Sequence, residues 1–359
     1  MLLVGCYAQV AKDELENIEE IDLVLGNNEK TNILECIEKY IKNNHKENIQ
    51  DVMHQAKFLD FGSVTYTAKT RAVIKVQDGC DRFCSYCIIP YARGRVRSRL
   101  PESIIEEIEK ISKEGIKEVV VTGIHVASYG KDFKNSYRLI DLLEDINKIE
   151  GIKRIRLGSI EPTLITEEFV NRLTKLEKMC DHFHLSLQSG CDETLKRMNR
   201  KYTTKEFKDC TDLLKNAYPD VALTTDIIVG FPGETDEEFE KTYNFLRDID
   251  FYKMHVFKYS PRKGTKAAVM KNQIDGNIKE ERSRRLIKLS DDNEKRHNDK
   301  YIGKTVKVLF EEEDGEKYIK GHTTNYIVVK VETVEKIENS IMEVTITRNE
   351  GNMLSGILK

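Results

Sequence analysis

Short β-branched segments alternate with amphipathic helical segments from Arg71 to about Tyr259, and this alternation limits the fold more than any other feature. Helical patterns such as 101–115, 166–179 and 236–249 follow the expected strands. Alternation of this kind is typical of βαβ units, in which helices cover a parallel sheet. The six expected strands lie at 72–76, 118–122, 152–157, 182–187, 222–229 and 254–259. Since a closed TIM barrel needs about eight strands, the sequence predicts an α/β fold with an open, partial (β/α)6 barrel.

Two smaller parts are expected to flank this barrel. The N-terminal part begins with a short apolar run, continues with a helical pattern and ends in a polar linker at 43–55. After Tyr301, alternating segments separated by Asp-Gly and Asn-Glu-Gly turns predict a small β-barrel. We therefore predict three parts, at 1–60, 66–300 and 301–359.

Composition excludes several classes of protein. The chain has 359 residues and a net charge of −3, so it is not a general binder of polyanions. It contains no apolar run long enough to span a bilayer, and its first residues do not resemble a signal peptide. Eight cysteines without a secretion signal favour a reducing compartment and metal ligation over disulfides. We expect a cytoplasmic protein with no membrane partner.

Cys80, Cys84 and Cys87 form a C-x3-C-x2-C motif directly after the first expected strand. A structural zinc site needs four ligands, and His125, the one candidate for the fourth, lies a whole βα unit away. A 4Fe–4S cluster held by three cysteines keeps one iron free to bind another molecule. The motif therefore favours a cluster over zinc.

This spacing, with Tyr86 before the third cysteine, resembles the radical S-adenosylmethionine (SAM) enzymes. The resemblance implies that the free iron binds SAM and that reduction splits SAM into methionine and a 5′-deoxyadenosyl radical. Polar or glycine residues at the rim of the barrel would then contact SAM. The candidates for these contacts are Tyr86, Gly123, Glu161, Gln188, Ser189 and Gly230.

Arginines follow the cysteine motif at alternate positions, namely Arg93, Arg95 and Arg97. They are candidates for contacts with RNA phosphates. An equally weighted alternative is ion pairing with nearby glutamates at 102, 106 and 107. The remaining cysteines have no partner spacing and are interpreted as structural: Cys36, Cys180, Cys191 and Cys210.

Nearly the whole chain resembles the methylthiotransferase branch of the radical SAM superfamily. The resemblance rests on GCYAQ around Cys6, CIIPYARGRVRSR, LSLQSGCDETLKRMNRKYT, TDIIVGFPGETDEEF and YSPRKGTKAA. It implies a second 4Fe–4S cluster in the N-terminal part, with Cys6 as one ligand, and an RNA-binding TRAM barrel at the C-terminus. The family has two further cysteine motifs ahead of GCYAQ, so we expect an incomplete second cluster in this polypeptide.

Within this branch, TGIHVASYGKD and the cysteine segment are most similar to the type that modifies N6-threonylcarbamoyladenosine in tRNA. This type adds a methylthio group to C2 of the base, next to the anticodon. The expected partners are a tRNA anticodon stem-loop and an electron donor such as flavodoxin or ferredoxin. The sister type, which acts on isopentenyladenosine, usually has Asn-Val in place of Ile124-His125. That activity, a ribosomal-protein substrate, and a non-catalytic RNA-binding form remain alternatives.

Overall fold

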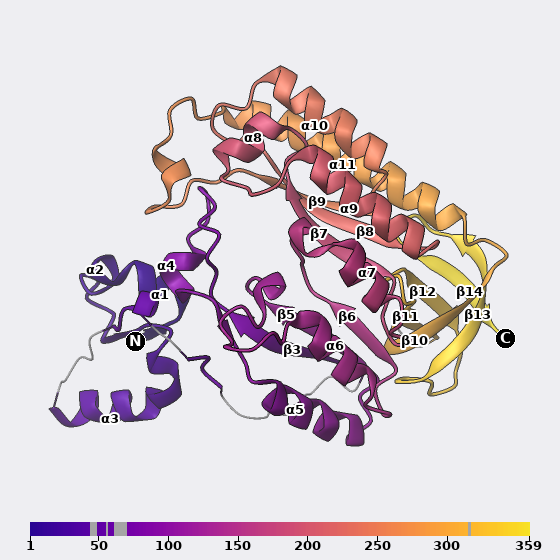
Figure 1. Ribbon diagram of the computed structural model, residues 1–359, viewed down its shortest axis with the longest axis horizontal. Coiled ribbons are helices and arrows are strands. Elements are labelled where there is room, and N and C mark those ends of the chain that lie inside the picture. The colour runs from indigo at the N-terminus through magenta and orange to yellow at the C-terminus, as the bar shows by residue number, and fades with distance from the viewer. Residues whose placement is uncertain (44–48, 55–56, 61–69, 315–316) are drawn as a thin grey trace.

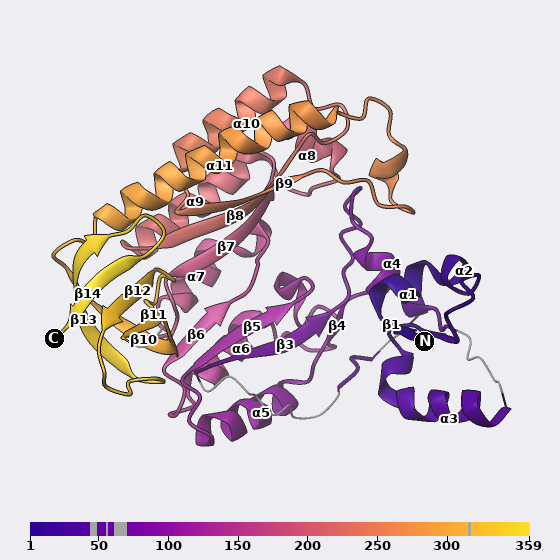
Figure 2. The same cartoon turned by 180° about the vertical axis from the view of Figure 1, so that it is seen from behind.

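The computed structural model describes residues 1–43, 49–54, 57–60, 70–314 and 317–359 (Figure 1). The N-terminal part lies at one end of the molecule and a C-terminal β-barrel at the other, with the central sheets between them (Figures 1 and 2). The predicted linker lies partly outside the described residues. The predicted limits of the three parts stay predictions.

The first central sheet has the strand order β4-β3-β5-β6. Its strands are β3 (Arg71–Asp78), β4 (Arg97–Ser98), β5 (Glu118–Gly123) and β6 (Arg154–Leu157). β3, β5 and β6 pair in parallel, whereas β4 runs antiparallel to β3. β4 was not predicted, because a strand of two residues is too short to show alternation.

The second central sheet has three parallel strands in the order β7-β8-β9. They are β7 (His182–Gln188), β8 (Ala222–Val229) and β9 (Lys253–Lys258). Isolated parallel bridges join the two sheets, from Ile155 to Met179 and from Ile160 to Leu185. The predicted partial barrel with six parallel strands is therefore confirmed.

Helices cover the outer face of this barrel (Figures 1 and 2). They are α5 (Pro101–Lys113), α6 (Leu139–Asn147), α7 (Glu167–Leu173), α8 (Asp192–Arg197), α9 (Thr204–Ala217), α10 (Asp236–Ile249) and α11 (Gly276–Asp299), whereas α4 (Ile89–Arg93) packs against the N-terminal part. On β3, Ala72, Ile74 and Val76 are fully buried in the main hydrophobic core. Alternate residues thus face the helices, as the period of a strand requires.

Local sequence signals explain where several helices begin. Thr235 and Glu238 form a capping box at the start of α10, so each satisfies a backbone N–H group of the first turn. The acidic start predicted for this helix is confirmed. In contrast, the helix predicted at 166–179 ends at Leu173, and the chain continues in turns toward β7.

The N-terminal part consists of two short parallel strands with helices around them. These elements are β1 (Leu2–Val4), α1 (Cys6–Val10), α2 (Lys12–Leu15), β2 (Leu23–Leu25) and α3 (Ile33–Asn43). Single 3-10 turns complete the described chain: η1 (Glu29–Asn32), η2 (Val52–His54), η3 (Val126–Ser128), η4 (Pro162–Leu164) and η5 (Lys266–Val269).

The C-terminal strands form a closed barrel in the order β10-β11-β12-β14-β13, which confirms the predicted small β-barrel. They are β10 (Thr305–Glu313), β11 (Tyr318–His322), β12 (Val328–Glu332), β13 (Ile341–Asn349) and β14 (Leu354–Leu358). Closure leaves no unpaired strand edge along the barrel wall. No helix within the described ranges is long and apolar enough to cross a membrane.

The C-terminal barrel packs against the ends of the central strands where those strands begin. Arg154 donates to His322 O (2.7 Å) and Arg156 to Thr324 O (2.9 Å). The ring of Tyr326 stacks between the rings of His182 and His322, with centroids 4.9 and 4.5 Å away. This end of the central barrel is therefore closed by protein, and the opposite end carries the candidate site.

Candidate functional site at the C-terminal end of the strands

The three motif cysteines lie on one loop, the cysteine loop (residues 79–88), between β3 and α4. Its first residue, Gly79, has φ of 71°, and a Cβ atom there would lie 1.8 Å from Arg95 O. Only glycine fits this position. Cys80, Cys84 and Cys87 are free thiols and partly exposed. The loop therefore presents three sulfurs at the end of the barrel where parallel strands carry functional residues.

Each motif sulfur accepts an N–H group. Cys80 Sγ accepts the backbone N–H of Arg82 (3.5 Å), and Cys84 Sγ accepts Nη1 of Arg200 (3.3 Å). The backbone N–H of Ile89 points at Cys87. Burial raises the pKa of the Cys80 thiol to about 11 and also raises the pKa of Cys87. Thiolate ligands at these positions therefore require the positive charge of bound metal.

These residues fit an iron–sulfur cluster better than a single ion. Within the described part of the chain, no group of three or more His, Cys, Asp or Glu side chains is arranged to hold one metal ion. His125, the candidate fourth zinc ligand, instead bonds Ser128 Oγ (2.7 Å) and Glu161 Oε2 (3.2 Å). A cluster takes one cysteine at each of three irons, and N–H groups directed at the sulfurs are typical of such sites.

Glu161 lies at the centre of a buried ionic network beside the cysteine loop. Its carboxylate pairs with Arg82 of the loop, with His125 (3.2 Å) and with Arg200 (3.6 Å). Burial favours the neutral acid, but the hydrogen bond from His125 and the charges of His125, Arg200 and Arg82 hold the pKa of Glu161 at about 2. The network therefore keeps one negative and several positive charges at the rim.

The predicted SAM contacts differ in what their side chains do. Tyr86 packs edge-on against Phe231 with ring centroids 6.3 Å apart, next to Gly230. Gly230 has φ of 68° and donates its N–H to Glu234 (2.6 Å). Gln188 has φ of 74° and is almost buried. Gln188 and Gly230 lie at the ends of β7 and β8, and Tyr86 lies on the cysteine loop, all at the same end of the strands as Glu161.

Two of the residues predicted to contact SAM, Ser189 and Gly123, are used in packing within the protein. Ser189 is fully buried, and its hydroxyl lies 3.2 Å from Thr242 Oγ1. A Cβ atom on Gly123 would lie 2.9 Å from Gln77 Oε1, so this glycine is needed for packing against β3. For both positions the structure provides a packing role.

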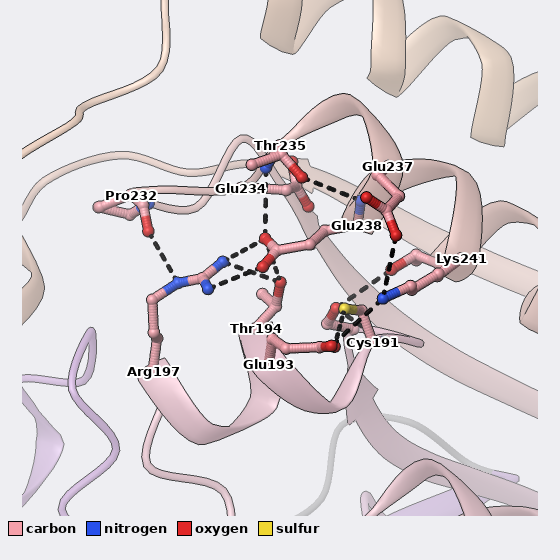
Figure 3. Close-up of polar contacts among 12 residues, drawn as sticks. Cys191, Glu193, Thr194, Arg197, Pro232, Glu234, Thr235, Glu237, Glu238 and Lys241 are labelled. Carbon is pink, nitrogen blue, oxygen red and sulfur yellow. Dashed lines mark hydrogen bonds and ion pairs between the residues drawn. The ribbon is translucent and has the colours of Figure 1, made fainter.

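The Gly-Phe-Pro-Gly turn after β8 is held by a dense polar network (Figure 3). Arg197 donates to Pro232 O (3.2 Å) and forms a two-pronged ion pair with Glu238 at the start of α10. Cys191 donates to Glu193 (2.9 Å), and Lys241 bonds the same carboxylate (3.2 Å). These side chains satisfy one another's hydrogen-bonding groups, and they fix the turn after β8 against α8 and the start of α10.

The arginines after the cysteine loop do not form one exposed row. Arg97 is only 2% exposed and donates to Arg93 O (2.8 Å), which places its guanidinium in the interior rather than at an RNA surface. Arg93 is partly exposed and lies 3.7 Å from Asp78. Arg95 is 53% exposed and lies over the ring of Phe83. Their ion pairs are therefore with aspartates, not with the glutamates named from the sequence.

Cys6 lies on the N-terminal part, at the start of α1. Its sulfur is 3.7 Å from Nδ2 of Asn27, which also donates to Ala92 O of α4. Cys6, Tyr7 and Tyr91 line an open cavity of about 880 Å³, with the loop after β9 (residues 261–264) opposite. Cys6 thus faces the cysteine-loop side of the central barrel.

Three residues beside the cysteine loop were not predicted from the sequence: Arg82, Asn199 and Arg200. They were hidden because their partners come from distant parts of the chain: Asn199 donates to Phe83 O (2.8 Å), and Arg200 reaches Cys84. The polar Asn-Arg-Lys run after α8 gave no distinct signal, since polar residues are common in loops that connect helices. The buried state of Cys36, Cys180, Cys191 and Cys210 agrees with the structural roles predicted for them.

Comparison with known proteins places this site. Residues 74–246 match the model of the Radical SAM superfamily. A solved structure of the cobalamin-dependent S-adenosylmethionine radical enzyme OxsB matches 82% of this chain and 43% of its own, with a TM-score of 0.52 and 14% identity. At that identity the likeness concerns the fold alone. The central barrel with its cysteine loop is that of a radical SAM protein, which makes SAM and a 4Fe–4S cluster its cofactors.

Curated relatives define the family more closely. The threonylcarbamoyladenosine tRNA methylthiotransferase MtaB of Bacillus subtilis strain 168 is 40% identical over 98% of this chain and 80% of its own length. The MtaB protein of Aquifex aeolicus is 38% identical over 94% and 81%. The tRNA-2-methylthio-N(6)-dimethylallyladenosine synthase of Caldicellulosiruptor saccharolyticus is 38% identical over 98% and 75%. The chain belongs to the radical SAM tRNA methylthiotransferase family, a family of transferases.

Proposed function

We propose that this protein adds a methylthio group to C2 of N6-threonylcarbamoyladenosine, next to the anticodon of tRNA. The observation that carries the proposal is the similarity to two MtaB proteins along at least 94% of the chain. The site supports it, because three cysteine sulfurs and a buried ionic network lie together at the functional end of a radical SAM barrel. The C2–H bond is inert to acid–base chemistry, so the reaction needs a cofactor radical.

In this proposal, Cys80, Cys84 and Cys87 hold the radical SAM cluster, which when bound with SAM supplies the 5′-deoxyadenosyl radical. The chain itself positions the reactants. Glu161 holds the guanidinium groups of Arg200 and Arg82 in place at the rim, and its low pKa keeps it ionised at neutral pH. Gln188, Gly230 and Tyr86 provide the polar and glycine surface against which SAM is oriented.

The tRNA contacts are proposed at both ends of the molecule. Arg93 and Arg95 lie beside the cysteine loop and are partly or largely exposed, so they can position a phosphate near the reaction centre. The closed C-terminal barrel would bind the stem at the other end. The target base must leave its stack to reach the cysteine loop, as is typical of single-stranded RNA recognition.

Cys6 is proposed as a ligand of the second cluster, because it lines the cavity that faces the cysteine-loop side of the barrel. An external one-electron donor, such as flavodoxin or ferredoxin, is needed because each reductive cleavage of SAM consumes an electron that no side chain can supply repeatedly. Reduced clusters and tRNA both point to the cytoplasm as the place of action.

The second candidate is methylthio transfer to dimethylallyladenosine in tRNA. The observation favouring it is the 38% identity to the Caldicellulosiruptor enzyme, close to the identity with the MtaB proteins. One observation counts against it. His125, just after β5, bonds Glu161 at the rim (3.2 Å), whereas the dimethylallyl type usually has Asn-Val in place of Ile124-His125. The two candidates share every cofactor and differ in the base that is recognised.

The test is anaerobic reconstitution followed by reaction with two tRNAs. One tRNA carries threonylcarbamoyladenosine and the other dimethylallyladenosine, and digested nucleosides are analysed by mass spectrometry. A methylthio product from the first tRNA alone supports the proposal, and a product from the second alone replaces it with the second candidate. Bound zinc without acid-labile sulfide would overturn both.

A further inference from the structure

Arg200 donates a hydrogen bond from its charged guanidinium to the sulfur of Cys84 (3.3 Å), and such a contact bears on the redox properties of a bound cluster. We propose that Arg200, by donating an N–H group to Cys84 Sγ, raises the reduction potential of the iron–sulfur cluster held by Cys80, Cys84 and Cys87. This inference rests on the proposed function, since it needs the cluster to be present. It makes Arg200 a positioning and potential-setting residue for the electron transfer that starts the reaction.

The first step of the argument is that the middle of the cysteine loop is fixed by the segment between α8 and α9. Ser85 donates its hydroxyl to Arg197 O (2.8 Å) and its backbone N–H to Met198 O (3.0 Å). Asn199, in the left-handed region with φ of 61°, donates to Phe83 O (2.8 Å). The residues on both sides of Cys84 are therefore anchored to the segment that carries Arg200.

The second step is that the Arg200 guanidinium itself is fixed. Only 8% of its side chain is exposed. Besides Cys84, it donates to Ser186 O (3.0 Å) and to the hydroxyl of Tyr202 (2.8 Å), and it lies over the Tyr202 ring at 4.9 Å. A guanidinium with its planar donors in use has little freedom to leave the sulfur. The contact with Cys84 is therefore preorganised.

The third step concerns charge. One-electron reduction adds a negative charge to a cluster already ligated by three thiolates, so a cation beside a ligand sulfur stabilises the reduced form more than the oxidised form. In the described structure, Cys80 and Cys87 accept backbone N–H groups, whereas Cys84 accepts a charged one. Charge-assisted hydrogen bonds are roughly twice as strong as neutral ones. Arg200 is thus the donor with the largest expected effect on the potential.

The experiment compares Arg200→Met with Arg82→Met in the reconstituted full chain, without SAM or tRNA. Arg82 is a matched control, because its side chain pairs with the same carboxylate of Glu161 but donates to no cysteine sulfur. Iron and acid-labile sulfide are counted first, and the midpoint potential is then measured by EPR-monitored titration with a low-potential reductant. The readout does not depend on activity.

We expect Arg200→Met to make reduction about tenfold less favourable, which corresponds to about 59 mV for a one-electron couple. Arg82→Met should shift the potential by much less. An unchanged potential in a loaded Arg200→Met protein, or an equal shift in Arg82→Met, would overturn this inference and leave the proposed function intact. Wild-type protein that takes up no iron and sulfide would overturn both.

A second variant, Arg200→Lys, keeps the inference testable if the Arg200→Met protein takes up no cluster. Lysine keeps the positive charge but cannot bond Cys84, Ser186 and Tyr202 together, so we expect a shift in the same direction and of smaller size. If both variants load the cluster and both keep the wild-type potential, the inference is wrong.

Discussion

Two buried carboxylates at opposite ends of the central strands have similar surroundings and different consequences. Glu118, at the start of β5, pairs with Arg71 (2.7 Å) and Arg156 (2.9 Å). Glu161, beyond the end of β6, pairs with His125 (3.2 Å), with Arg200 (3.6 Å) and with Arg82. In both cases burial favours the neutral acid, and the neighbouring cations nevertheless lower the pKa of the carboxyl group.

The difference lies in where the cations make their other contacts. At the Glu118 end, Arg156 continues to Thr324 O of the C-terminal barrel, so the network joins two parts of the protein. At the Glu161 end, Arg200 continues to Cys84 Sγ, and Arg82 belongs to the cysteine loop itself. The first network ends on groups of the C-terminal barrel, whereas the second reaches the sulfur of Cys84, a proposed ligand of the cluster. The same arrangement of charges therefore attaches the C-terminal barrel at one end and surrounds the proposed cofactor site at the other.

The largest expected effect is that of a substitution in the cysteine loop, at the Glu161 end of the strands. Cys84→Ala should abolish the radical SAM cluster and reduce methylthio transfer to the background of the assay, while the apoprotein unfolds near the wild-type temperature. Iron and sulfide counts and tRNA nucleoside analysis measure this. The matched control is Cys210→Ala, because Cys210 is buried and donates to Pro162 O (3.2 Å), away from the motif. Loss of the cluster in the control would contradict the assignment.

The next effect separates the two carboxylates by stability. Glu118→Gln should lower the free energy of unfolding by about 3–5 kcal/mol, because it leaves the buried charge of Arg156 without its carboxylate partner. Glu161→Gln should cost less, since 24% of the Arg82 side chain is exposed and can be hydrated, against 3% for Arg156. Denaturant unfolding of the apoprotein measures both. A larger loss for Glu161→Gln would reverse the comparison.

Lowering the pH should reduce the difference in free energy of unfolding between the wild-type protein and Glu118→Gln. The pKa of Glu118 is lower in the folded protein than in the unfolded chain, so its contribution is present above the unfolded pKa of about 4.3 and is lost as pH falls toward the folded pKa. The stability gap between the two proteins should therefore narrow below about pH 4. Unfolding at several pH values tests this, and a gap that stays constant would contradict it.

The smallest effect concerns the aromatic contact beneath Glu118. Tyr326→Leu should lower the stability by about 1–2 kcal/mol, because the ring stacks with His182 and His322 and receives the guanidinium of Arg156 at 4.6 Å. Thermal unfolding measures the change. Tyr318→Leu on β11 is the matched control, since Tyr318 is about as exposed as Tyr326 (39% against 36%) and its ring contacts a cation, Lys330, but stacks with no aromatic ring among the described residues. Equal losses of stability in the two variants would show that the stacking of Tyr326 on the histidine rings adds no stability of its own.

Much of the fold could be predicted because its signals are local. The strand–helix alternation indicates six parallel strands, and each is present, because alternate residues such as Ala72, Ile74 and Val76 must be buried against helices. The capping residues of α10 are likewise read from neighbours three positions apart. β4 and the early end of α7 were missed, since two residues carry no period and tertiary packing decides where a helix stops.

The candidate site was predicted in part. The spacing of the cysteines is a property of one loop, and it identifies Cys80, Cys84 and Cys87 without any knowledge of distant residues. Arg97 was predicted with Arg93 and Arg95 as a candidate contact for RNA phosphates, but it is buried, because spacing in a sequence does not tell which side chains are covered. In the structure its guanidinium turns inward toward Asp78, at 3.5 Å.

The sequence by itself determined the class of barrel, the cysteine loop and the family, since each depends on residues that lie close together along the chain. Only the tertiary structure decided which charges surround that loop. Arg200 is 116 positions from Cys84, yet its guanidinium lies 3.3 Å from the sulfur. Such contacts arise because parallel strands bring their C-terminal ends to one rim, so residues from successive strands meet there whatever their separation in sequence.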